Sequence, residues 1–209
     1  MPRIESIGHR IELVSMDQHY ENISIGLYGQ ESAGGREYLV RTYSTKAGGG
    51  ERIEYVKRAM QTLGGMEATP GGNLRFACGS AHELGARRIF LESCKQDPAV
   101  PITARPMSLI DKKSGLTITV SAESGGVYGV AADSEEPVSA ARVSHITGGL
   151  AKLGAMEKQA MAGVSFDCGS DHDALVGLLL VRAPNVRAVL REQESAASRG
   201  MLAAPSQQK

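Results

Sequence analysis

The chain has 209 residues, 42% of them hydrophobic and 22% charged, a composition that is typical of folded globular proteins and argues against global disorder. Its 23 basic and 23 acidic residues cancel, and aromatic residues make up only 4%. The chain therefore lacks the basic excess and the aromatic stacking residues that are typical of nucleic-acid binders. Because it also lacks an apolar run of membrane-spanning length and has only three widely spaced cysteines, we expect a soluble, cytoplasmic protein with no nucleic-acid or membrane partner.

One segment of the chain occurs twice. When the sequence is shifted by ninety positions, ten residues of the segment Arg52 to Leu91 are identical in the segment Arg142 to Val181. Chance would give roughly two or three identities. Such a repeat indicates two copies of one supersecondary unit that bury their faces against each other. The sequence therefore predicts an α+β fold made by tandem duplication, with two layers of sheet and helix and pseudo-two-fold symmetry.

Strands are predicted first in each half. In the first half, Arg10–Met16, Asn22–Tyr28 and Glu37–Tyr43 alternate as strands do, and the turn at Gly34-Gly35 joins the last two as a hairpin. The second half offers the matching strands Leu116–Ser121 and Val127–Ala131.

A helix follows these strands in each copy. Its apolar residues recur with a period of 3.6 residues, which predicts one buried stripe. The stripe residues are Ile53, Val56, Met60 and Leu63, and then Val143, Ile146, Leu150 and Leu153. We expect Gly64 and Gly154 to end the two helices in the left-handed conformation.

The next predicted element is a strand, Leu74–Cys78 and again Val164–Cys168, in which each cysteine shares the apolar face. After it, Ser80 and Ser170 are predicted to cap helices, with Glu83 and Asp173 completing each cap; these acids follow the serines by three residues. Residues 84–94 and 174–182, the second of which is apolar on all sides, could each be a helix or a buried strand, and we favour helices because the cap occurs in both copies. An amphipathic stretch follows over Asn185–Gln193.

These elements divide the chain into two repeats that form one compact unit. The first repeat covers residues 1–97, a proline-containing linker covers 98–106, and the second repeat covers 107–193. Residues 194–209 are small and polar, and we expect a flexible tail there.

The repeated block Phe-x-Cys-Gly-Ser-x-His, followed by Glu or Asp, is where reactive side chains recur. A structural interpretation makes the two cysteines small core residues, the glycines turn formers, and the serines and acids helix caps. It leaves His82 and His172 unexplained.

A metal site is the first functional interpretation of this block. Two sulfurs and two imidazoles would suit tetrahedral zinc if the two copies converge. The four residues are Cys78, His82, Cys168 and His172. A variant of this site uses the two histidines with Glu83 and Asp173 and favours a divalent metal that keeps open positions.

Two further interpretations need no metal. The helix start at Ser80 or Ser170, beside a histidine, could hold a small anionic ligand. Alternatively, His82 could activate Cys78 as a thiol nucleophile.

The order β-β-β-α-β-α, its doubling and the chain length resemble the organisation of imidazoleglycerol-phosphate dehydratases, which are metal-dependent enzymes built from two such halves. That family carries His-His-x-x-Glu at the junction from strand to helix. Here the junction carries a single histidine, His82 or His172, with the acid directly beside it. The resemblance therefore implies a fold order, and neither residues nor activity.

Two hypotheses for function follow. In the first, the protein is an enzyme or a binder of a small ligand, an anion or a metal, with a cleft between the halves lined by His82 and His172. In the second, it is a non-catalytic assembly protein whose two similar surfaces pack against other subunits. This hypothesis allows the chain to form a homo-oligomer. We favour the first, because capping does not explain the two histidines.

Overall fold

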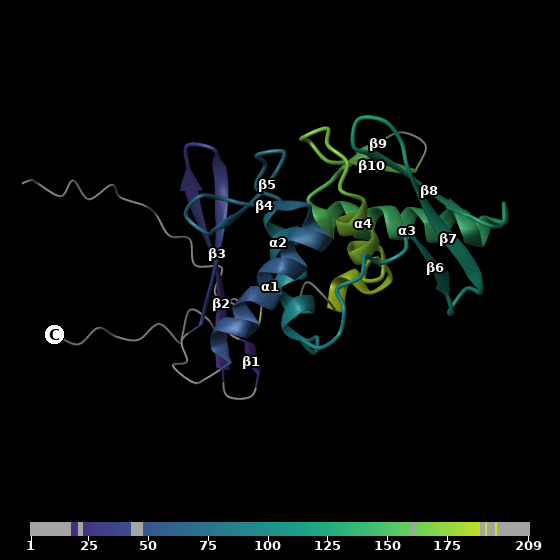
Figure 1. Ribbon diagram of the computed structural model, residues 1–209. Coiled ribbons are helices and arrows are strands. Elements are labelled where there is room, and N and C mark those ends of the chain that lie inside the picture. The colour runs from purple at the N-terminus through teal and green to yellow at the C-terminus, as the bar shows by residue number, and fades with distance from the viewer. Residues whose placement is uncertain are drawn as a thin grey trace, which may run out of the picture.

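The computed structural model describes residues 18–20, 23–42, 48–159, 162–188, 191 and 195. Within them the chain forms two five-stranded antiparallel sheets and five helices, one of which is a short 3-10 helix. The helices occupy the middle of the molecule, with one sheet on each side (Figure 1). The predicted α+β class is confirmed, whereas the predicted strand Arg10–Met16 and nearly all of the predicted tail 194–209 lie outside the described residues.

The first half contains five strands and two helices. Its sheet has the order β1-β2-β3-β5-β4, and β2 and β3 form the long hairpin predicted from the Gly34-Gly35 turn. The elements are β1 (Gln18–Tyr20), β2 (Ile23–Ser32), β3 (Gly35–Thr42), α1 (Gly49–Gly64), β4 (Met66–Ala68), β5 (Leu74–Phe76) and α2 (Glu83–Cys94).

The second half has the same order of elements and the equivalent sheet order, β6-β7-β8-β10-β9. Its elements are β6 (Ser108–Asp111), β7 (Leu116–Ala122), β8 (Val127–Ala132), α3 (Pro137–Gly154), β9 (Glu157–Gln159), β10 (Gly163–Ser165), α4 (Asp173–Leu180) and the 3-10 helix η1 (Ala183–Asn185). Register also agrees across ninety positions, because Tyr38 pairs with Leu74 and Tyr128 pairs with Val164.

The predicted helical stripes form the core. Val56 and Met60 on α1, and Ile146 and Leu150 on α3, are fully buried. Each such side chain contributes about 1.5–3 kcal/mol through the apolar surface that it removes from water. The predicted helices over 84–94 and 174–182 are confirmed as α2 and α4. Both touch the helices of the other half, so the core runs continuously between the sheets.

Gly64 and Gly154 are the last residues of their helices, as predicted, but neither adopts the predicted left-handed conformation. That conformation belongs to the next residue, Gly65 at φ 59° and Ala155 at φ 51°. A β-carbon on Gly64 would lie 2.7 Å from Ile89 Cδ1, so the end of the Ile89 side chain from α2 packs directly over this glycine. Gly154 is covered in the same way by the end of the Leu179 side chain from α4.

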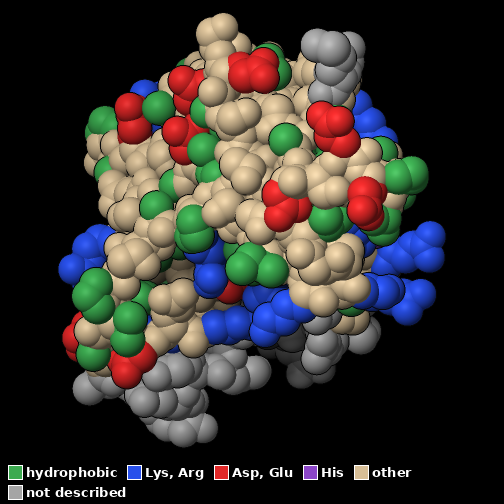
Figure 2. All heavy atoms as spheres, turned by 90° about the vertical axis from the view of Figure 1, so that its right-hand side faces the viewer, with side chains coloured by type: hydrophobic (Ala, Val, Ile, Leu, Met, Phe, Trp, Pro, Cys, Tyr) green, Lys and Arg blue, Asp and Glu red, His purple; other side chains and the backbone are tan. Residues whose placement is uncertain are grey.

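The far face of the second sheet is mostly polar, with Ile110 on β6 as an exposed apolar residue. On β7, Ile118 and Val120 are buried against the helices, whereas Thr119 and Ser121 are exposed. At this end of the molecule apolar side chains are scattered among polar ones, and basic side chains gather along the lower part of the view in Figure 2. In the part of the chain that the structure describes, no helix combines the length and apolar character needed to span a membrane.

Candidate metal centre

The two repeated corners begin with a tight turn after β5 and β10. Gly79 at φ 76° and Gly169 at φ 66° both adopt the left-handed conformation that glycine allows without steric cost. This turn brings the next backbone amide onto the sulfur, as the N–H of Ser170 donates to Cys168 Sγ at 3.4 Å. Ser80 makes the equivalent backbone hydrogen bond to Cys78. The strands end earlier than predicted, at Phe76 and Ser165, so both cysteines lie beyond them, half-buried and packed against the hydrophobic core as predicted.

A histidine stands immediately before each helix. His82 has φ 34° and ψ 47°, a left-handed conformation that is rare outside glycine, whereas His172 has φ −132° and ψ 51°. Both imidazoles turn inward and are only 6% and 7% exposed. Each reaches the cysteine of its own corner, with 3.2 Å between Cys78 Sγ and His82 Nε2 and 3.4 Å between Cys168 Sγ and His172 Nε2.

The two corners meet between the halves of the molecule. The imidazole rings of His82 and His172 lie edge to face with 4.7 Å between their centroids. The rings of Phe76 and Phe166 pack against them, each 4.9 Å from His82. One ligand atom from each histidine and each cysteine forms a group in which every pair lies within 4.8 Å. This group of two buried histidines and two half-buried cysteines could hold a metal ion.

Burial sets the protonation of these side chains. It lowers the pKa of His82 to about 4, with the neighbouring His172 adding to the effect, and it also lowers the pKa of His172. Burial raises the pKa of the Cys78 thiol, against the opposing hydrogen bond from Ser80. Both imidazoles are thus neutral at neutral pH, which is the form that binds metals. A divalent cation would favour the thiolate that burial alone disfavours.

Tyr38 and Tyr128 support the corners and were missed in the sequence. Tyr128 Oη accepts the N–H of His172 at 2.5 Å and donates to Asp173 Oδ1 at 3.0 Å. Tyr38 Oη donates to the carbonyl of Ala81, the residue before His82. The two tyrosines are themselves ninety positions apart, so extending the same shift upstream of Arg52 would have found them.

The predicted helix caps are wrong. The residues at the N-cap positions are His82 and His172, and neither makes a side-chain capping hydrogen bond. Ser80 and Ser170 lie two residues earlier, and their backbone amides donate hydrogen bonds to the cysteine sulfurs.

The repeated acids point away from the cluster into other interactions. Glu83 forms ion pairs with Arg87 at 3.3 Å and with Arg36 at 3.7 Å. Asp173 accepts the hydroxyl of Tyr128. The site variant that adds these carboxylates to the histidines therefore lacks its oxygen ligands. The hypothesis of a Cys78 nucleophile is also disfavoured, because the two pKa shifts oppose a thiolate–imidazolium pair.

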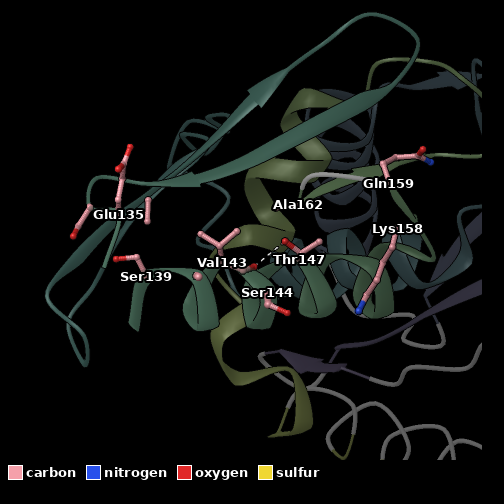
Figure 3. Close-up of a pocket in the computed structure, with 11 residues that line it drawn as sticks. Glu135, Ser139, Val143, Ser144, Thr147, Lys158, Gln159 and Ala162 are labelled. Atoms are coloured by element: carbon pink, nitrogen blue, oxygen red, sulfur yellow. Dashed lines mark hydrogen bonds between the residues drawn. The ribbon is translucent and has the colours of Figure 1, made fainter. Parts of the chain in front are cut away.

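A cavity of about 480 Å³ lies apart from this cluster, in the second half. It runs along α3, where Val143 and Ala140 give it an apolar wall and Thr147 adds a hydroxyl group. Glu135 lies at one end of the cavity and Lys158 toward the other (Figure 3). None of its lining residues belongs to the cysteine–histidine cluster, and no sequence motif points to this cavity.

In comparisons with known proteins, no family model, curated protein or solved structure matches this chain.

Proposed function

We propose that this is a zinc-binding protein in which one ion, held between the halves, has a structural role. The observation that carries the proposal is the convergence of four ligand atoms within 4.8 Å of one another. Around a tetrahedral zinc ion, bond lengths of about 2.3 Å to sulfur and 2.0–2.1 Å to nitrogen place sulfur and nitrogen about 3.5 Å apart. The observed separations of 3.2 Å and 3.4 Å within the two corners agree with this spacing.

The ligand set supports zinc over other ions. Magnesium, calcium and manganese prefer carboxylate and carbonyl oxygens, whereas two thiolates with two imidazoles in a tetrahedral arrangement are typical of zinc. The backbone hydrogen bonds to Cys78 and Cys168 would stabilise the thiolate charge, and the tyrosines fix the backbone at each histidine.

A structural role is supported by the closed ligand shell. Four side chains fill a tetrahedral site, so no position remains for a substrate or an activated water, as a catalytic zinc site needs. The buried imidazoles between Phe76 and Phe166 also differ from side chains that line an open cleft. We therefore prefer a structural zinc ion to the enzyme hypothesis.

We further infer that the ion lies on a pseudo-two-fold axis that relates two duplicated halves. Near such an axis a residue contacts its own equivalent. Pairs ninety positions apart do this repeatedly: His82 meets His172, Glu92 Oε1 lies 2.7 Å from Arg182 Nη2, and Gly85 faces Leu175. The unlike backbone angles of the two histidines make the symmetry approximate.

Metal analysis of the purified chain tests the proposal. We expect one zinc ion per chain, lost in Cys168→Ser and His172→Ala but kept in the matched controls Cys94→Ala and His145→Ala, whose side chains lie outside the cluster. Cobalt substitution should give the visible absorption of a tetrahedral thiolate site. A chain purified without metal that also takes up no zinc or cobalt would contradict the proposal.

A further inference from the structure

The four members of the cluster differ in their access to solvent. The imidazoles of His82 and His172 are buried, whereas Cys78 and Cys168 are half-buried and keep part of their surface in contact with water. The remaining cysteine, Cys94, is buried in α2, with 3% of its surface exposed. Of the three cysteines, the two in the cluster are therefore more accessible to a small oxidant dissolved in water than Cys94 is.

We propose that Cys78 and Cys168 form a redox pair, in which a hydroperoxide-class oxidant converts the two thiolates into a disulfide and releases the metal ion. This inference rests on the proposed zinc site and concerns its regulation. The geometry supports it because the two sulfurs, which come from different halves, lie within 4.8 Å of each other. A disulfide needs them about 2.05 Å apart, so its formation requires the two side chains to rotate toward each other as the metal–sulfur bonds break.

The reaction balances without any further reactant. One thiolate attacks the peroxide, so that an S–O bond forms, the O–O bond breaks, and a sulfenic acid and a hydroxide ion result. The second thiolate attacks the sulfenic sulfur, which forms the S–S bond and expels a second hydroxide ion. Two protons from solvent convert both hydroxides into water. Each sulfur loses one electron and the peroxide gains two, while zinc leaves with its oxidation state unchanged.

The consequence is an exchange of one link between the halves for another. The ion ties both corners through four bonds, and the disulfide ties them through the cysteines alone, which frees His82 and His172. A reductant together with zinc would restore the original state. The site therefore combines the two features of redox-responsive thiols, partial exposure and a resolving cysteine close by.

The test uses the full chain carrying Cys94→Ala, which leaves the two cluster cysteines as the only thiols. Zinc content is measured first, because its absence at this stage would count against the proposed function itself. Hydrogen peroxide is then added with a chromogenic zinc chelator present, and intact mass is followed. We expect release of the bound zinc in step with a product lighter by two hydrogen atoms, a Cys78–Cys168 link in peptide maps, and recovery with dithiothreitol and zinc.

Two outcomes would overturn the inference while leaving the zinc site intact. In one, zinc stays bound while peroxide leaves both thiols unmodified. In the other, zinc leaves but the chain gains oxygen atoms, or couples to a second chain, instead of losing two hydrogens. The double variant Cys78→Ser with Cys94→Ala serves as the control, since it has a single thiol and cannot form the lighter product within one chain.

Discussion

At the scale of single residues, Tyr128 connects the second sheet to the proposed metal ligands. Its ring is fully buried, and its hydroxyl lies between the backbone N–H of His172 and the carboxylate of Asp173. Because the hydroxyl accepts the backbone N–H of His172, it fixes the backbone from which the imidazole projects. Partners of this kind orient ligands and tune metal affinity without bonding to the metal.

Tyr128→Phe should therefore weaken zinc binding while preserving the fold. We expect a loss of roughly 10–100-fold in affinity, the usual cost of removing such a partner. Competition with a chelator of known affinity measures it, and far-UV circular dichroism monitors the fold. Tyr55→Phe is the matched control, because its hydroxyl donates to Val100 at 3.4 Å, away from the cluster. Equal affinities of the two variants would show that the Tyr128 hydroxyl does not position His172.

The sequence predicted the four ligands because a repeat at fixed spacing reveals which side chains recur together. It did not show that they converge, because the inward turn of the imidazoles depends on backbone angles that local pattern does not encode. His82 in the left-handed region is an example, as few non-glycine residues adopt it. The serines were misassigned as caps for a related reason, since their amides bind the sulfurs instead.

At the scale of elements, α3 contains two adjacent glycines in unlike surroundings. A β-carbon on Gly148 would meet only the end of the Lys158 side chain, at 3.8 Å. A β-carbon on Gly149 would lie 2.6 Å from the carbonyl oxygen of Ala183, in the 3-10 helix that packs on α3. Backbone cannot give way as a side-chain end can, so the second glycine sets the distance between these two elements.

Alanine at these two positions should change stability in opposite directions. Gly148→Ala should raise the free energy of unfolding by about 0.5–1 kcal/mol, because alanine loses less conformational entropy in a helix. Gly149→Ala should lower it by about 1–3 kcal/mol, the usual cost of overpacking. Urea denaturation with zinc present measures both. A neutral or stabilising Gly149→Ala would mean that η1 does not pack closely against α3.

Long elements with a clear period were predictable, and short or fully surrounded ones were not. The apolar stripes of α1 and α3 were enough to predict those helices. β4 and β9 contain three residues each, too few to show the alternation that predicts a strand. α4 was ambiguous because it is apolar on all sides. The structure explains this, since α4 contacts helices of both halves and leaves no polar face toward solvent.

At the scale of the whole molecule, one carboxylate joins three separate parts of the chain. Glu92 on α2 pairs with Arg88 of the same helix at 2.6 Å and with Arg182, beyond α4, at 2.7 Å. Arg105 of the linker lies 3.6 Å from its second oxygen. Because the side chains of Glu92 and Arg88 are only 6% and 1% exposed, this network is desolvated and sensitive to the loss of its single negative charge.

Glu92→Gln should consequently destabilise the protein by about 3 kcal/mol or more, since it leaves buried guanidinium charge opposite a neutral amide. Arg182→Gln, whose side chain is about one-third exposed, should cost less than about 1 kcal/mol. Thermal and urea unfolding of both variants at equal zinc concentration gives the comparison. Similar small losses in the two would indicate that Glu92 is solvated and that the network contributes little.

The ligands of the cluster all belong to one polypeptide, Cys78 and His82 before the linker and Cys168 and His172 after it. If two separate chains supplied these corners, dilution would pull them apart and release the ion. Within a single chain the second corner is always present at a high effective concentration, set by the linker and not by how much protein the solution holds. Occupancy of the site should then depend on free zinc alone, and it should be the same at nanomolar and at micromolar protein.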